Sequence, residues 1–343
     1  MIKEKFLVPS YYTSFKCKGK SCRKCCCGGW GITLNKKEYY KILNVDCSKE
    51  LKDKICAYVT ILKDATDERY AKINLNYYGE CPLRLENGYC GLQVEVGEEE
   101  IPSICRYYPR SPRVFPEKIA LISSSCEWLI EELIKDNEPI SFKEENLSFN
   151  FDKDKDQMIY PSNYKEVINS SIAIISDRNY NFDERINNLA EYLHVNLSSF
   201  SIIYLKEVIN VISSVYIKNH SIGEYTSNIT YDEKITFTEI YNRLLSFFPD
   251  LDIYLEKIFT NHFIFMNFPF ISLDFNRSDA LISLFIIYRY YLVLLYFNLN
   301  SSDVNQFVDI TSEFFRIAEH SNLYNVAKNV KTYVDCSLVK SNK

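Results

Sequence analysis

The hydrophobic pattern in the second half of the chain is that of helices buried on one face. From about residue 160 onward, apolar side chains recur at steps of three and four residues, which is the period of an amphipathic helix. This pattern predicts helices around two clear apolar runs: Tyr164, Val167, Ile168, Ile172 and Ile175, and then Ile186, Leu189, Ala190 and Leu193.

Helix start signals in the same half of the chain agree with this pattern. Asn181 with Glu184, and Thr236 with Glu239, have the spacing of a capping box, in which two side chains bond the first free backbone groups. Because the periodicity stays helical, we expect an all-helical domain, with further helices over residues 203–218, 239–248, 251–266, 276–298 and 303–319.

The first third of the chain has a different character. Eight of the nine glycines lie at or before Gly97, in turns such as CGGWG and ENGYCG. Short helices are expected over residues 35–43, 48–63 and 127–136. We therefore expect this part to be a loop-rich module.

The two parts meet in a charged stretch, residues 138–162, which breaks the periodicity and has a proline near each end. We expect this stretch to be the linker. The predicted fold is mainly α, with a cysteine-rich, metal-binding module over residues 1–140 and a helical domain over residues 141–343.

One apolar segment, residues 280–299, is long enough to cross a bilayer. It carries Arg289 at its centre, which costs about 2.5–3.5 kcal/mol on insertion scales. No basic cluster flanks the segment. We therefore expect a buried helix and no membrane span.

Bulk composition agrees with a soluble globular protein, since 47% of the residues are hydrophobic and 25% are charged. The net charge of −5 argues against a general nucleic-acid binder, which would have a basic domain. The N-terminal residues lack the apolar core of a secretory signal. We expect a cytoplasmic protein whose thiols stay reduced.

Cysteine use is the most unusual feature of the chain. Eleven of its twelve cysteines lie between Cys17 and Cys126. In a reducing compartment such density predicts metal binding, because thiolates are soft, anionic ligands for zinc and for iron–sulfur iron. A disulfide-rich secreted protein ranks behind this interpretation, since the signal segment is missing.

The spacing of the cysteines favours an iron–sulfur cluster over zinc. Zinc ribbons usually carry two matched C-x₂-C pairs, whereas this chain has C-x₄-C, C-x₂-C, adjacent cysteines and then distant single ones. Zinc stays open as the alternative. Basic side chains around the first cysteines would offset the negative charge of a cluster or simply form a solvated loop; they are Lys16, Lys18, Lys20, Arg23 and Lys24.

Four cysteines fit a ligand role less well. Cys47 and Cys56 lie in or beside a predicted helix, and Cys56 is expected to be a buried structural thiol. Cys336 is isolated, and we expect it to be structural or exposed. Cys25 is ambiguous, because three successive residues cannot easily ligate one ion.

Four blocks follow one another in order: FKCKGKSCRKCCCGGW, CPLRLENGYCGLQVEVGEE, CRYYPR and SSSCEWL. Together they resemble the flagellin lysine-N-methylase family, which shares its cysteine pattern with a wider group of zinc- or iron-chelating proteins. The segment LEKIFTNHFIFMNFPF, residues 255–270, resembles a later family stretch loosely, and Cys25 departs from the pattern. The matching positions are Cys17, Cys22, Cys26, Cys27, Gly29 and Trp30; Cys81, Pro82, Gly88 and Cys90; Cys105, Pro109 and Arg110; and Cys126 with Glu127.

The resemblance implies methyl transfer from S-adenosylmethionine to lysine side chains of flagellin. It also implies a [4Fe–4S] cluster. Which four of the matching cysteines would hold the cluster, and whether a second metal uses the rest, stays open. The eight candidates are Cys17, Cys22, Cys26, Cys27, Cys81, Cys90, Cys105 and Cys126.

The residues alone say little about where the methyl donor binds. The Gly-rich turn of nucleotide-binding folds is missing, and so is the C-x₃-C-x₂-C motif of radical enzymes, since position 29 is Gly. The donor would bind at an open iron or between the two domains. Trp30 would line its pocket or pack against the metal loop, and Arg110 would grip a carboxylate or form an internal ion pair.

No catalytic residue is assigned from the sequence, because a base and alignment could suffice for a direct methyl transfer. His262 is the one histidine that we would test. The second hypothesis is a non-catalytic zinc- or iron-binding module that mediates a protein interaction through the helical domain.

Overall fold

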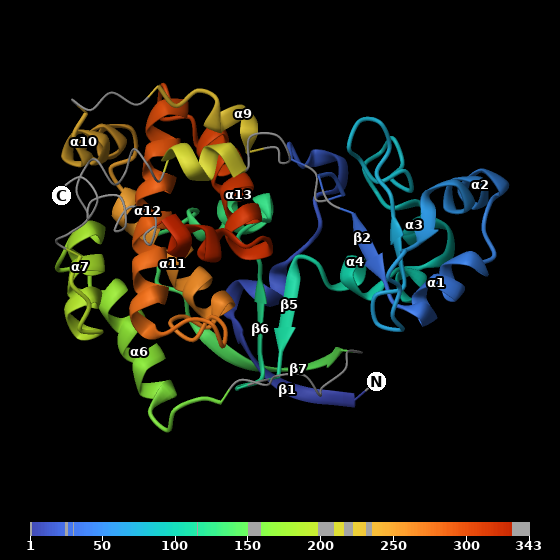
Figure 1. The fold of residues 1–343 in the computed structure, drawn as a ribbon, viewed down its shortest axis with the longest axis horizontal. Helices are drawn as coiled ribbons and strands as arrows, with labels where there is room; N and C mark the ends of the chain where they lie inside the picture. Colours follow the sequence, from blue (N-terminus) through green and yellow to red (C-terminus); the bar gives the residue numbers. More distant parts are fainter. Residues whose placement is uncertain are drawn as a thin grey trace, which may run out of the picture.

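The computed structural model describes residues 2–24, 27–29, 31–114, 116–149, 159–197, 209–215, 222–230 and 235–330. Figure 1 shows a bundle of helices on one side, a small unit of short strands and helices on the other, and a four-stranded sheet between them. We call residues 31–107 the small unit and residues 159–330 the helical region.

The four-stranded sheet has the order β5-β6-β1-β7. Its strands are β1 (Ile2–Pro9), β5 (Arg110–Arg113), β6 (Ile119–Ile122) and β7 (Phe142–Phe149). β1 runs antiparallel to β7 along its whole length and parallel to β6, with Leu7 opposite Ile119.

The presence of β7 corrects our expectation of a linker over residues 138–162. Within this charged stretch, Leu147 and Phe149 alternate with polar Ser148 and pack against the main hydrophobic core. Such alternation is the period of a half-buried strand, and the surrounding charges conceal it in the sequence. The division between domains near residue 140 stays a prediction.

The small unit is built on a second, antiparallel sheet of order β2-β4-β3. Its elements are β2 (Ile32–Leu34), α1 (Lys36–Leu43), α2 (Lys49–Tyr58), β3 (Val59–Ile61), β4 (Ala71–Ile73), α3 (Gly91–Val96), η3 (Glu98–Glu100) and α4 (Ser103–Tyr107). Leu34, Ile55 and Ile73 lie in its own aliphatic core.

The helix expected over residues 48–63 is too long. The structure ends α2 at Tyr58, and Val59–Ile61 forms β3. Val, Thr and Ile favour a strand because their branched side chains fit a pleated surface, and β4 supplies the partner.

The segment between the small unit and the helical region carries α5 (Glu127–Leu133), where we expected a helix over residues 127–136. Near the N-terminus, two short 3₁₀ helices, η1 (Ser10–Ser14) and η2 (Gly19–Ser21), lead from β1 to the first cysteines.

All the regular elements in the described part of residues 159–330 are helices, as expected. They are α6 (Tyr164–Ile175), α7 (Phe182–Tyr192), a helical stretch at 209–215, α9 (Gly223–Thr226), α10 (Phe237–Phe247), α11 (Leu251–Met266), α12 (Arg277–Asn298), α13 (Val304–His320) and a helical stretch at 323–330. The capping boxes of Asn181 with Glu184 and of Thr236 with Glu239 are confirmed. The rest of the predicted helix 203–218 lies outside the described residues.

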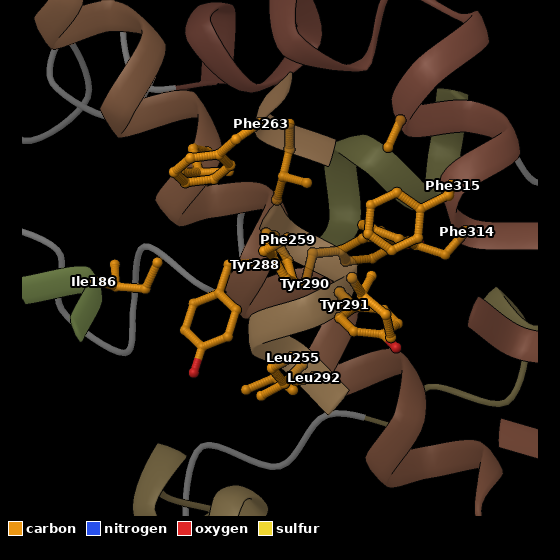
Figure 2. Packing of buried hydrophobic residues seen from close by; sticks show 14 of the residues in the cluster. Ile186, Leu255, Phe259, Phe263, Tyr288, Tyr290, Tyr291, Leu292, Phe314 and Phe315 are labelled. Atoms are coloured by element: carbon orange, nitrogen blue, oxygen red, sulfur yellow. The ribbon is translucent and has the colours of Figure 1, made fainter. Parts of the chain in front are cut away.

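The core of the helical region is aromatic and lies where α11, α12 and α13 meet. Figure 2 shows Phe259, Tyr291 and Phe315 packed together there. The rings of Phe259 and Phe315 are 5.8 Å apart, and those of Tyr291 and Phe314 are 4.8 Å apart. Each buried aromatic side chain contributes about 1.5–3 kcal/mol by leaving water.

The long apolar helix α12 lies in this core. It is long and apolar enough to cross a bilayer, yet 83% of its most apolar window is buried within the structure. Arg289 pairs with Asp183 at 2.8 Å and stacks on the ring of Phe237. The buried-helix interpretation therefore fits the structure.

The predicted fold class is right for the helical region and incomplete for the first part. Every strand in the described residues lies before residue 150. The strands of the small unit have only three residues each, and such short strands leave little periodicity in a sequence.

Candidate active site between the cysteine loop and the helical region

The cysteine loop, residues 16–29, is fixed to the helices by ion pairs. Lys18 donates to Glu127 and, at 2.8 Å, to Glu131, both on α5. The backbone N–H of Arg23 donates to Glu127 at 2.7 Å, and its guanidinium donates to Asp309 of α13 at 2.7 Å. The Glu127 side chain is 1% exposed, so this pairing holds the loop against α5 and α13.

Lys24 extends the same contact. Its ammonium lies 3.7 Å from a carboxylate oxygen of Glu224 and 5.5 Å from the centre of the Tyr225 ring, both on α9. Lys18, Arg23 and Lys24 are thus paired with carboxylates of α5, α13 and α9, and their charges are available to a metal cluster only together with those partners.

Three expected ligands, Cys17, Cys22 and Cys126, lie in the segments that make this contact. Cys126 is the N-cap residue of α5, and its backbone carbonyl accepts the N–H of Leu129 at 2.9 Å. Burial is the main cause that raises the pKa of the Cys126 thiol to about 12, and Cys22 and Cys17 act in the same direction.

Three other expected ligands, Cys81, Cys90 and Cys105, belong to the small unit, and Cys27 of the cysteine loop contacts that unit. The backbone N–H of Cys81 donates to the carbonyl of Cys27 at 2.7 Å. The backbone N–H of Arg84 donates to the carbonyl of Cys81 at 3.1 Å, and Arg84 and Cys90 form an isolated antiparallel β-bridge. Cys90 is the N-cap residue of α3 and packs, like Cys81 and Cys105, against the aliphatic core. The expected ligands thus fall into two groups, and Cys26 lies outside the described residues.

The fit of this donor set to a metal is incomplete. Cys90 and Cys126 offer soft sulfur donors at the N-caps of α3 and α5, although burial raises the pKa of both thiols and so disfavours the thiolate. However, no three Cys, His, Asp or Glu side chains in the described ranges are gathered closely enough to hold an ion. We therefore assign no step of a reaction to a metal.

The other cysteines take different places. Cys47 is half-buried and packs against the core of the small unit. Cys56 is exposed, so our expectation of a buried thiol is wrong: its neighbour Ile55 turns into the core, and one residue of helix rotates Cys56 toward solvent. Cys25 and Cys336 lie outside the described residues.

Of the two expected donor-binding residues, Trp30 is also outside the described residues. Arg110 begins β5, and its guanidinium donates to the carbonyl of Arg106 at 2.7 Å and to the Glu98 carboxylate at 3.3 Å. The structure therefore gives Arg110 the internal ion pair that we considered beside a ligand role.

A buried polar network links the serines before Cys126 to the helical region. The Glu319 carboxylate of α13 accepts from the Ser123 hydroxyl at 2.6 Å and the Ser124 backbone N–H at 2.9 Å. His262 Nδ1 lies 3.0 Å from its other oxygen, and His262 Nε2 lies 2.9 Å from the Tyr324 hydroxyl. The Glu319 carboxylate is therefore fully engaged.

The residue before His262 completes the link. Asn261 donates to the Ile122 carbonyl at 3.0 Å and to the Ser124 hydroxyl at 2.9 Å, and it accepts from Tyr11 of η1. The SSSC block and the segment 255–270, which lie more than a hundred residues apart in the chain, are thus in direct contact.

His320, the last residue of α13, forms the accessible edge of this network. Its Nε2 atom lies 2.8 Å from the Ser123 hydroxyl and 3.0 Å from the Ser125 hydroxyl. Its residue surface is exposed, whereas the serines are buried. The rings of Tyr108 and Phe265 flank it, with centres 5.7 and 5.8 Å away.

Part of this network is visible in the sequence. His262 stood out beside Asn261, and three serines in a row precede Cys126. Glu319 and His320 had no signal, because their partners lie 195 to 197 residues away in the chain.

Comparison with known proteins gives distant relatives. Proteins named lysine-N-methylase, from Salmonella typhimurium and Salmonella choleraesuis, are each 27% identical to this chain over 143 residues. The match covers 40% of this chain and spans only 35% of the length of each of these relatives. A Salmonella muenchen protein named flagellar biosynthetic protein FliU is 27% identical over 139 residues, which is 40% of this chain and 80% of that protein.

No protein-family profile and no solved structure matches the chain. The described fold therefore has no structural template among these comparisons. The chain is distantly similar to proteins named for lysine methylation and for flagellar biosynthesis.

Proposed function

We propose that this protein transfers a methyl group from S-adenosylmethionine to lysine side chains of flagellin. The observation that carries the proposal is the similarity to two proteins named lysine-N-methylase. The name of the third relative supports a flagellar substrate. We place the reaction in the cytoplasm, where the many thiols would stay reduced.

A direct methyl transfer requires few catalytic groups from the protein. The neutral lysine amine attacks the methyl carbon, so that an N–C bond forms while the C–S bond breaks and its electron pair goes to sulfur. The protein must align the two molecules and accept one proton from the lysine ammonium. The contact between the cysteine loop and the helical region brings together residues that are far apart in the chain, as such alignment requires.

We include a metal in the proposal, namely a [4Fe–4S] cluster, with zinc as the alternative. When bound, either would fix the cysteines and order the loops that carry them. Cys17, Cys22 and Cys126 are the described candidates beside α5, Cys81, Cys90 and Cys105 are those on the small unit, and Cys27 of the cysteine loop contacts that unit.

We also keep Arg110 and Trp30 as candidates for donor binding. The Glu98 partner of Arg110 is 52% exposed and 3.3 Å away, so a donor carboxylate would compete with a weak, solvated ion pair. Weaker donor binding by Arg110→Ala, with the same stability as wild type, would support this assignment, and unchanged binding would contradict it.

The test of the proposed function is co-expression with flagellin, followed by peptide mass spectrometry of every flagellin lysine. We expect methylated lysines that are absent when the protein is omitted. Unmethylated flagellin, with no donor binding by the purified protein, would contradict the proposal.

The second candidate is a non-catalytic metal-binding module, favoured by the close attachment of the cysteine loop to α5 and α13. Anaerobic purification and analysis of iron, sulfide and zinc distinguish the two. Iron with equal sulfide supports the cluster protein, whereas stoichiometric zinc without sulfide or donor binding supports the module.

A further inference from the structure

The site of interest is the surface around His320. Its imidazole lies between the rings of Tyr108 and Phe265, with the buried serines behind it. The side chains of Tyr108 and Phe265 are half-buried. An imidazole with aromatic walls and one accessible side is suited to a cationic amine, which binds favourably to aromatic faces.

The hydrogen bonds behind His320 can be followed proton by proton. The Ser123 hydroxyl gives its only proton to Glu319 at 2.6 Å and accepts the backbone N–H of Ser125. It can therefore only accept at Nε2 of His320. The Ser125 hydroxyl is 2.5 Å from the Ser123 hydroxyl, 2.8 Å from the Tyr108 hydroxyl and 3.0 Å from Nε2. Its one proton can therefore turn to Ser123 or to Nε2, and it can pass to Nε2 when Tyr108 supplies another.

Both protonation states of the imidazole consequently have a partner at Nε2. The neutral ring accepts from the Ser125 hydroxyl, and the protonated ring donates to Ser123. The arrangement holds the ring in place while a proton arrives and leaves.

Glu319 is kept as a fixed acceptor by the opposite end of the network. Burial raises the pKa of the Tyr324 phenol, so its hydroxyl stays protonated and donates to Nε2 of His262. Nδ1–H of His262 then donates to Glu319. Because His262 donates to one oxygen of Glu319, the other oxygen accepts the Ser123 proton, and this proton stays between Ser123 and Glu319.

We propose that His320 accepts, through Tyr108 and Ser125, the proton that a substrate lysine must lose before methylation; this rests on the proposed function. The ammonium gives a proton to the Tyr108 oxygen while the Tyr108 proton moves to Ser125 and the Ser125 proton moves to Nε2. The products are a neutral amine and an imidazolium. The amine lone pair then forms the N–C bond as the C–S electron pair leaves with sulfur.

The charge balance around the ring suits this role. Burial is the main cause that lowers the pKa of His320. The charge of Glu319 raises this pKa, and the charge of Arg316 lowers it. The groups that face the ring are these two from α13 and Tyr108 from the segment before β5. The ring is therefore neutral near pH 7 and able to take a proton.

The experiment measures methyl transfer to flagellin at saturating donor, from pH 6 to 10, for the wild type and for His320→Asn. We expect the wild-type rate to be level near pH 8 and to fall as His320 becomes protonated. The variant should be about 100-fold slower at pH 7, the usual contribution of a general base. Its rate should keep rising toward the lysine pKa of about 10.4, since solvent must then remove the proton.

Two further variants separate chemistry from folding. Tyr108→Phe keeps the ring and Ser125→Ala removes one oxygen; each interrupts the relay, and each should show the same rising pH profile. His194→Asn is the matched control, because His194 is exposed and has a φ of 59°, which Asn tolerates. It should retain the wild-type rate and profile.

The outcomes are distinct. A wild type that methylates no lysine overturns the proposed function, and this inference with it. An active wild type together with folded His320→Asn, Tyr108→Phe or Ser125→Ala proteins of unchanged rate and profile overturns the inference alone. If His320→Asn does not fold, the two relay variants decide the question.

Discussion

The small unit and the helical region bury very different kinds of side chain. The core of the small unit is aliphatic, with Leu34, Ile55 and Ile73 at its centre. That of the helical region is aromatic, as Phe259 and Phe315 show in Figure 2. Large aromatic side chains bury more area each, so the helical region can be stable through packing alone.

The small unit has a smaller core and fewer large buried side chains to stabilise it. A short, loop-rich region with a small core usually needs a further constraint, such as a metal or disulfides. Most of the expected ligand cysteines are in this unit or in the loop that contacts it. The two regions thus differ in the kind of core that they bury. Perturbing each in turn tests whether the small unit needs a further constraint and the helical region does not.

The largest effect is expected from Cys81→Ser. If a metal holds the small unit, the free energy of metal binding is also folding free energy, about 10 kcal/mol or more for small metal-bound domains. The variant should lose metal and expose the small unit to proteolysis while the helices persist. Exposed Cys56→Ser in the same unit is the control, and full metal retention by Cys81→Ser would refute the idea.

The next effect concerns the aromatic core. Phe259→Ala removes a fully buried ring and should lower the free energy of unfolding by about 3–5 kcal/mol. Chemical denaturation measures this change. Tyr78→Ala, at a side chain that is 83% exposed, should change it little. Equal effects of the two variants would contradict the described packing.

A smaller effect tests the attachment of the cysteine loop to α5. Glu127→Gln removes the buried charge that Lys18 and Arg23 share, and should cost about 1–3 kcal/mol, the usual cost of an unsatisfied buried group. Hydrogen exchange should rise in the cysteine loop and stay unchanged in α12. The more exposed Glu132→Gln on the same helix serves as the control. Unaltered exchange in the loop would show that Glu127 does not hold it.

The smallest effect is a pH dependence of stability. The pKa of His320 is lowered from 6.5 in the folded protein, so the unfolded chain binds more protons at mildly acidic pH. Stability should therefore be fully present above about pH 6.5 and fall as the pH drops below it. His320→Asn should flatten this part of the stability profile, and an identical profile would show that folding does not lower the pKa of His320.

The sequence predicted best what depends on local pattern. The helix over residues 251–266 has the predicted bounds, and the capping boxes of α7 and α10 lie where the spacing placed them. These features depend on contacts within one turn or one helix face.

What depends on distant partners was missed. β3 needs β4 to become a strand, and β7 needs β1, which is more than a hundred residues earlier. The polar network is the extreme case, since Ser123 and Glu319 are 196 residues apart. The local pattern of a single sequence carries no information on such distant pairings. The site is therefore visible in the sequence only as isolated serines and one histidine.

The central claim is that the protein methylates lysine, and the most direct measurement uses purified components. Wild type and His320→Asn would each be incubated with flagellin and S-adenosylmethionine at pH 7, and the lysines analysed by peptide mass spectrometry. The account predicts methylated lysines with the wild type and a strongly reduced yield with the variant. Flagellin that stays unmodified with the wild type would contradict the account.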